Sequence, residues 1–300
     1  PPGKDTVVTS GRFAPSPSGD LHLGNLRTAL LAWLFARSSG RRFLMRMEDL
    51  DRVREGSEAR QLADLRAIGL DWDGPVVRQS QRTALYENAI AFLTAAGLTY
   101  ECFCTRREIL EAASAPHAPA GAYPGTCRNL TEAQKSAQTR PPALRLRAEV
   151  TEFAVDDVVV GRFHGQVDDV VLRRVDGVPS YNLAVVVDDG DQGVDQVVRG
   201  DDLLSSSPRQ AYLATLLGIT VPTYAHVPLA LNSQGNRLAK RDGAVTLEDQ
   251  AALGLGPRDV LSIMAQSLEL AAPDEPVTVE QLLRRFDPAA LPRTPWIFET

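Results

Sequence analysis

The sequence predicts an α/β fold built on a parallel sheet. Two observations carry this prediction: short apolar runs typical of strands alternate with amphipathic helical patterns along the first hundred residues, and Pro and Gly residues separate them. Alternating strands and helices imply a parallel sheet with helices on its faces. The expected elements, in chain order, are a strand at 7–13, a helix at 23–37, a strand at 41–49, and helices at 55–70 and 82–98.

Local chemistry sets the boundaries of these first elements. Pro15 and Pro17 forbid a helix before Leu23, so we expect a loop between the first strand and the first helix. Gly97 ends the third predicted helix, because glycine readily adopts the left-handed conformation that follows a helix.

The middle of the chain has a different composition. The stretch 114–129 is rich in Ala, Pro and Gly and is expected to be irregular chain within an insertion. Alternating Val and Arg residues from Leu144 onward then predict a small antiparallel sheet. The run "SYNLAVVVDD" at 180–189 predicts a strand buried on both faces, at which the parallel sheet resumes.

The last third of the chain is predicted to be mainly helical. Residues 207–218 form a clear helical pattern, with Ser207 as the candidate N-cap and Pro208 in the first position. Beyond about residue 246 we expect two helices and a Pro-rich end.

Composition narrows the class of protein. The 300 residues are 44% hydrophobic and 23% charged, as in ordinary globular proteins. The net charge of -6 argues against a protein that simply coats nucleic acid, although Arg128, Arg140, Arg145 and Arg147 offer a local basic patch. The longest apolar run, "ALLAWLFA", is far shorter than the roughly 20 residues of a membrane span. We therefore expect a cytoplasmic protein that has no membrane partner.

Two polar loops offer groups suited to binding phosphate. The first, "PSPSGDLHLGN", leads into the helix at 23–37, where free backbone N–H groups favour an anion. Gly24 would let a phosphate approach the backbone, and His22 and Asn25 could both donate to it. The second loop, "NRLAKRDGA" at 236–244, carries the cations Arg237, Lys240 and Arg241. Taken singly, the first loop could equally be the start of a capped core helix with an incidental histidine, and the second is more often a solvated surface loop.

Together, the two loops resemble the two signature motifs of class I aminoacyl-tRNA synthetases. The resemblance is closest to the glutamyl branch, whose order is matched by "GRFAPSPSGDLHLGN", "RMEDLDR", "VPSYNLAVVVDD", "VVRGDDLL" and "RLAKRDGA" between residues 11 and 244. It implies a Rossmann-type catalytic domain that binds ATP and Mg²⁺. It also implies ATP contacts from five residues: His22, Gly24, Asn25, Arg237 and Lys240. His22 and Lys240 would be catalytic.

The same resemblance implies a pocket for L-glutamate. Its lining would be Arg12, Phe13, Ala14, Pro15, Ser16, Glu48, Tyr181 and Arg199. Either Arg12 or Arg199 can bind the side-chain carboxylate as a planar fork, and Glu48 can hold the ammonium group. Three positions depart from the family pattern. Arg237 replaces the first lysine of the Lys loop, which keeps a cation there. Val185 stands where a polar residue is common, which predicts a less polar pocket, and Ala239 replaces a serine of the Lys loop, which predicts weaker activity.

Three cysteines lie close together in the sequence and suggest a metal. Cys102, Cys104 and Cys127 can supply three thiolates to a tetrahedral zinc ion. His117 is the orthodox fourth ligand. Tyr123 is preferred here only because the pattern is similar to the zinc site of a truncated relative of glutamyl-tRNA synthetase. The alternative is three unrelated reduced thiols and a packing tyrosine.

The chain ends about 56 residues after Ala244, where full glutamyl-tRNA synthetases continue into helical domains that read the anticodon. The resemblance is therefore to the truncated relatives, ATP-dependent ligases that transfer activated glutamate to the queuosine base in the anticodon stem-loop of tRNA(Asp). One alternative is a minimal glutamyl-tRNA synthetase that charges a tRNA 3′ end, and another is an idle module that senses glutamate or a nucleotide. The expected divisions are a catalytic domain at 5–100 and 181–245, a zinc-containing insertion at 101–180 and a small helical module at 246–300.

Overall fold

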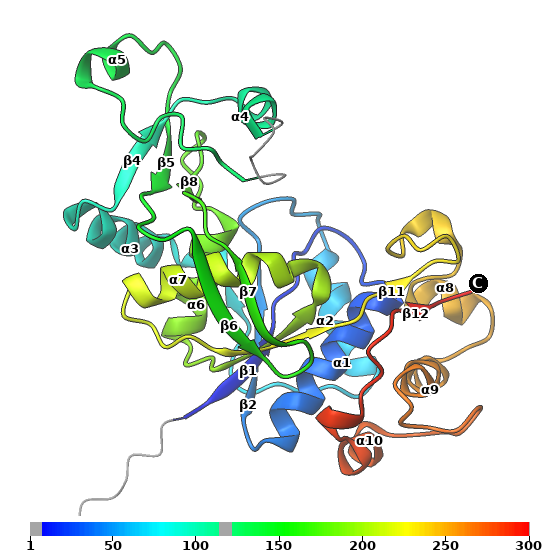
Figure 1. Ribbon diagram of the computed structural model, residues 1–300. Coiled ribbons are helices and arrows are strands. Elements are labelled where there is room, and N and C mark those ends of the chain that lie inside the picture. The colour runs from blue at the N-terminus through cyan, green and yellow to red at the C-terminus, as the bar shows by residue number, and fades with distance from the viewer. Residues whose placement is uncertain (1–7, 114–121, 300) are drawn as a thin grey trace, which may run out of the picture.

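A parallel sheet forms the centre of the molecule (Figure 1). The structure is a computed structural model that describes residues 8–113 and 122–299. In its first half, β1 (Ser10–Phe13), β2 (Arg42–Met47) and β3 (Val77–Arg78) pair in parallel in the order β1-β2-β3. The predicted α/β fold with a parallel sheet is confirmed.

The second half of the sheet joins the first at β1. Its order is β7 (Gly161–Gln166), β6 (Glu152–Asp157), β10 (Thr223–Val227) and β9 (Gln196–Gly200), with only the β6–β7 pair antiparallel. A parallel bridge between Ser10 and Val194 places β9 beside β1. The strand order thus reverses between β1 and β9, and such a switch point opens a crevice at the carboxyl ends of the strands.

Helices cover both faces of this sheet. The first is α1 (Leu23–Ser38), whose residues from Leu26 to Ala36 are almost all buried because the helix runs through the main hydrophobic core. The others are α2 (Ser57–Ala67), α3 (Thr83–Ala95), α6 (Tyr181–Asp191) and α7 (Ser207–Leu216). Gly97, with φ of +74°, follows α3 as predicted. Within the described ranges, no helix combines the length and apolar character needed to cross a membrane.

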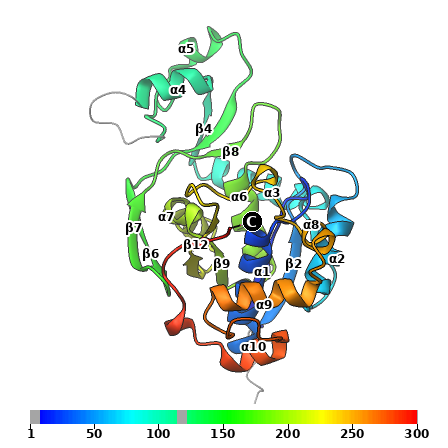
Figure 2. The same cartoon turned by 90° about the vertical axis from the view of Figure 1, so that its right-hand side faces the viewer.

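Two smaller parts flank the sheet on opposite sides (Figures 1 and 2). One contains the antiparallel strands β4 (Thr99–Cys102), β5 (Ala143–Leu146) and β8 (Val171–Arg173), with the short helices α4 (Arg106–Ala113) and α5 (Glu132–Ser136). The other contains α8 (Leu247–Ala252), α9 (Pro257–Ser267) and α10 (Val279–Arg285). It ends in β12 (Trp296–Ile297), which pairs with β11 (Ala230–Leu231).

The largest correction concerns residues 180–189, which form most of α6 rather than a strand. Ser180 caps this helix by accepting a hydrogen bond from Leu183 N at 3.2 Å. Every residue from Leu183 to Asp189 is buried, so the run has no polar face to reveal the helical period, and an apolar run of this length fits either element. The strand that resumes the sheet is β9 instead.

Three smaller expectations also need correction. Ser207 is the first residue of α7 rather than its N-cap, which is Ser206, and the hydroxyl of Ser207 is engaged with Arg199. Three α-helices, α8, α9 and α10, lie between residues 246 and 299, where two were expected. The antiparallel strands after Leu144 divide between two sheets, since β6 and β7 join the central sheet through β10.

Candidate active site

A cavity of about 610 Å³ lies at the carboxyl ends of β1 and β9. A second cavity of about 500 Å³ shares part of its lining, including His22 and Glu48. The first is lined by predicted residues Arg12, Phe13, Ala14, Pro15, Ser16, His22, Asn25, Glu48, Tyr181, Arg199 and Lys240. Gly24 and Arg237 line the second. The fold therefore brings the predicted ATP and glutamate residues to one place.

His22 is the N-cap of α1, and its hydrogen bonds define which ring nitrogen faces the cavity. Its Nδ1 accepts from Asn25 N at 3.3 Å, while Asn25 Oδ1 accepts from His22 N at 3.1 Å. Burial, with a contribution from Arg237, lowers the pKa of His22 to about 4. The ring is therefore neutral with its proton on Nε2, which stays available as a donor together with Asn25 Nδ2. A side chain at Gly24 would meet the His22 ring at 3.1 Å.

The Lys loop reaches the same cavity from the other half of the chain. Lys240 begins a short 3₁₀ turn that is held by Asp242, whose carboxylate accepts from Ala239 N at 2.6 Å and from Asn232 Nδ2 at 3.0 Å. Arg237 pairs with Asp202 at 2.7 Å. The loop thus presents Lys240 next to the His22 turn, while Arg237 is partly neutralised.

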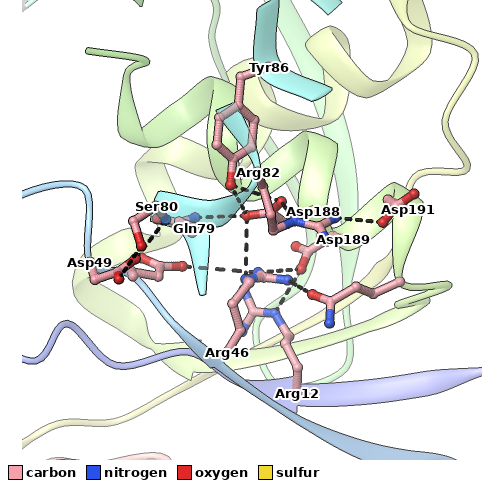
Figure 3. Close-up of polar contacts among 12 residues, drawn as sticks. Arg12, Arg46, Asp49, Gln79, Ser80, Arg82, Tyr86, Asp188, Asp189 and Asp191 are labelled. Carbon is pink, nitrogen blue, oxygen red and sulfur yellow. Dashed lines mark hydrogen bonds and ion pairs between the residues drawn. The ribbon is translucent and has the colours of Figure 1, made fainter. Parts of the chain in front are cut away.

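Arg12 is anchored by a buried carboxylate behind the cavity (Figure 3). Its Nε donates to Asp189 Oδ1 at 3.1 Å, and the same oxygen accepts from Arg46 Nη2 at 2.7 Å. Burial alone would raise the pKa of Asp189, but Arg12 and Arg46 together hold it below its ordinary value. Asp189 is therefore an anion between two cations, and Arg12 carries its own counter-ion.

Asp188, the neighbour of Asp189 on α6, closes the same network toward α3 (Figure 3). It accepts from Arg82 Nε at 2.6 Å, from Tyr86 Oη at 2.8 Å and from Gln79 Nε2 at 2.9 Å. With all these partners buried or half-buried, the pair of aspartates ties α6 to β2 and α3.

Glu48 directly follows β2 and faces the cavity. Its backbone N donates to Pro15 O at 2.9 Å, which fixes the first loop against the end of β2. Burial raises the pKa of its carboxyl group to about 7, against the opposing effect of Arg46, which lies 4.0 Å away, and of Arg12. A carboxylate so poor in partners is suited to binding a cationic group.

Arg199 on β9 is held only by neutral groups. Its Nε donates to His226 Nε2 at 3.0 Å, Nη1 to Gln210 Oε1 at 2.8 Å and Nη2 to Ser207 Oγ at 3.0 Å. No carboxylate of the described chain pairs with it. A buried cation without a counter-ion is suited to binding an anionic ligand.

Tyr181 and Val185, one turn apart on α6, have different surroundings. The Tyr181 side chain lines the cavity and is 42% exposed. Val185 is 1% exposed and packs in the hydrophobic cluster between α3, α6 and α7. The predicted effect of Val185 on pocket polarity is therefore wrong, because that prediction assumed a strand.

The three cysteines gather around Tyr123 at the end of β4. Their sulfur atoms lie within 4.8 Å of one another, and Tyr123 Oη is 3.3 Å from Cys102 Sγ and 3.7 Å from Cys104 Sγ. Three thiols and a phenol in one cluster are a donor set compatible with zinc. The alternative ligand His117 lies outside the described residues.

Sequence reasoning missed Asp189, Arg46 and His226, although each holds a cavity residue or adjoins one. The doublet at the end of "AVVVDD" was a usable signal, because two carboxylates at the end of an apolar run require buried cations. His226 gave no such signal, since it stands alone within a strand.

Comparison with known proteins agrees with the motifs. A family model described as "tRNA synthetases class I (E and Q), catalytic domain" matches residues 7–300. A glutamyl-Q tRNA(Asp) synthetase of Nocardia farcinica is 70% identical, covering 97% of this chain and 94% of its own length. One from Cutibacterium acnes is 52% identical, covering 94% and 85% respectively.

A solved structure shows the same fold. The crystal structure of a glutamate tRNA ligase from Elizabethkingia meningosepticum in complex with its amino acid is 28% identical, with a TM-score of 0.82. The match covers 97% of this chain and 67% of that one. The resemblance found in the sequence is confirmed, and the chain belongs to the glutamyl-Q tRNA(Asp) synthetase family of class I aminoacyl-tRNA synthetases.

Proposed function

We propose that this protein activates L-glutamate with ATP, without needing tRNA, and transfers it to the queuosine base at the wobble position of tRNA(Asp). Membership of the family supports this activity. The single observation that carries it is that His22 and Lys240, from distant parts of the chain, line one cavity with Glu48 and Arg199. The RNA partner is the anticodon stem-loop that carries queuosine.

The first step joins two anions. An oxygen of the glutamate α-carboxylate attacks the α-phosphorus of ATP, the bond to the bridging oxygen of the β-phosphate breaks, and pyrophosphate leaves with that electron pair. Catalysis is then mainly positioning and charge stabilisation. We assign this to the Nε2–H of His22, the N-terminus of α1 and the ammonium of Lys240. Mg²⁺ enters with ATP and supplies further charge neutralisation at the phosphates.

Two side chains of opposite charge, Arg199 and Glu48, hold the amino acid. Arg199, which lacks a counter-ion in the described chain, binds the side-chain carboxylate. Glu48 binds the ammonium group, whose charge restores the ionised state of this buried carboxylate. Arg12 and Tyr181 shape the walls, and the first loop, Phe13 to Ser16, covers the substrate.

We assign a structural zinc ion to Cys102, Cys104, Cys127 and Tyr123. The closeness of the phenol to two of the sulfurs supports Tyr123 as the fourth ligand. One zinc ion per chain by elemental analysis, and a lower melting temperature after chelation, test the metal site.

We also propose a division of the chain into a catalytic domain at 5–100 and 181–245, an insertion at 101–180 and a helical module at 246–300. The β6–β7 hairpin of the insertion pairs with the catalytic sheet through β10.

The test of function is pyrophosphate exchange with glutamate, glutamine and aspartate, followed by transfer to tRNA(Asp) with and without queuosine. Exchange with glutamate alone and transfer only to queuosine-containing tRNA are expected. Ester formation at the 3′ end of queuosine-free tRNA would indicate a minimal glutamyl-tRNA synthetase, and no exchange would indicate a sensor. Lys240→Ala should abolish exchange in a folded protein. Arg241→Ala, which changes the exposed residue next to it, is the control and should remain active.

A further inference from the structure

His226 is a fully buried histidine on β10, immediately behind Arg199. Arginine can only donate hydrogen bonds, so His226 Nε2 must accept the bond from Arg199 Nε at 3.0 Å. The ring proton therefore sits on Nδ1, which lies 2.6 Å from Asp157 Oδ2. Asp157 thus fixes the tautomer that Arg199 requires.

The surroundings of His226 enforce this neutral form. Ser207 Oγ lies 3.1 Å from Nε2 and accepts from Arg199 Nη2, so its own proton points at the same lone pair. The ring of Tyr224 stacks on the imidazole at 5.6 Å. Burial, aided by Arg199, lowers the pKa of His226 despite the neighbouring carboxylates Asp157 and Asp201.

The imidazole also keeps a carboxylate away from Arg199. The other oxygen of Asp157 accepts from the backbone N of Val159 and Val160, so this residue is held in the β6–β7 turn. A neutral ring lies between Asp157 and the guanidinium, in contrast to the direct contact of Asp189 with Arg12. Arg199 has five N–H donors and uses three on fixed neutral acceptors, which leaves one on each terminal nitrogen.

We propose that His226, oriented by Asp157, is a positioning residue that makes Arg199 selective for a carboxylate over an amide in the substrate side chain, that is, for glutamate over glutamine. This rests on the proposed function, because it takes Arg199 as the anchor of that carboxylate. A desolvated guanidinium fixed by neutral partners gains a counter-ion from glutamate. Glutamine offers only a dipole and leaves the charge unpaired.

Two variants of His226 distinguish a role in positioning Arg199 from a role in stabilising the fold. In His226→Gln the amide oxygen can occupy the place of Nε2 and accept from Arg199, whereas in His226→Asn the shorter amide reaches Asp157 but not Arg199. We expect His226→Asn to raise the KM for glutamate at least tenfold and to lower the glutamate-to-glutamine selectivity by a similar factor. The KM for ATP and kcat should stay within about twofold, and His226→Gln should restore most of the loss.

A double variant completes the test. If His226 acts through Arg199, adding His226→Asn to Arg199→Met should change glutamate affinity no further, as measured by calorimetry. Equal behaviour of the Asn and Gln variants, or additive losses in the double variant, would overturn the positioning role. Absence of glutamate binding and exchange in the unaltered protein would instead overturn the proposed function, so the two failures are distinguishable.

Discussion

Arg12 and Arg199, two of the arginines that line the cavity, differ in what holds them. Arg12, on the β1 side, contacts Asp189, an anion buried between two cations. Arg199, on the β9 side, contacts an imidazole, an amide oxygen and a hydroxyl. One arginine is therefore neutralised inside the fold and the other is left for a ligand. The comparison teaches that the partner of a buried cation, more than its place in the cavity wall, indicates whether it serves the fold or the substrate.

The largest expected effect is on stability, and it falls on the β1 side. Arg12→Met leaves Asp189 with one cation instead of two and should lower the free energy of unfolding by about 3 kcal/mol. Urea denaturation measures this. Arg162→Met, which breaks the exposed pair between Arg162 on β7 and Asp156 on β6, is the matched control and should cost less than about 1 kcal/mol. Equal losses in both variants would mean that the Asp189 network contributes little.

The next effect is on binding, and it falls on the β9 side. Arg199→Met removes the cation that we propose binds the side-chain carboxylate, so the Kd for glutamate should rise about 100-fold, equivalent to about 3 kcal/mol. Its unfolding free energy should change by less than that of Arg12→Met, because no described carboxylate loses a partner. Isothermal calorimetry with both variants makes the comparison. A larger loss of affinity in a folded Arg12→Met protein would reverse the assignment.

The third effect is a pH dependence contributed by Glu48. Burial raises its pKa to about 7, so the carboxyl group becomes protonated below that pH and can no longer make the pair with the substrate ammonium that we propose. Glutamate affinity should therefore fall from pH 8 to pH 6, approaching tenfold per unit at the acid end. Glu48→Gln should bind more weakly but with no such slope.

Glu48 should affect the stability of the ligand-free protein with a pH dependence opposite to its effect on glutamate affinity. A carboxyl group with a raised pKa in the folded state is most favourable when protonated, so its cost appears as pH rises from the unfolded value of about 4.5 toward 7. Glu48→Gln should therefore raise the melting temperature of the ligand-free protein at pH 8 and leave it nearly unchanged at pH 4. A destabilised variant at pH 8 would contradict this account.

Sequence reasoning reached the cavity but not the interactions behind it. The loop around His22 and the Lys loop were recognisable, because phosphate binding demands cations and glycine at a helix start. Residues 180–189 were misassigned, because a helix buried on all sides carries no periodic signal. Because of that error, the contact between Asp189 and Arg12 could not be predicted, since it depends on the helical position of Asp189. The role of His226 depends on the neighbouring strand β9, a contact that no local pattern encodes.

The smallest expected effect comes from giving Arg199 a carboxylate partner, as Arg12 already has in Asp189. Gln210 accepts from Arg199 Nη1 and donates to Asn182 Oδ1, so Gln210→Glu would place a carboxylate against Arg199 with almost no change of shape. The new anion should raise the free energy of unfolding by about 1 kcal/mol and weaken glutamate binding about fivefold, because Arg199 would then carry its own counter-ion. Gln210→Met, which removes the acceptor without adding charge, separates loss of a hydrogen bond from neutralisation. If the Glu variant bound glutamate as tightly as the unaltered protein, an unneutralised Arg199 would not be what attracts the substrate.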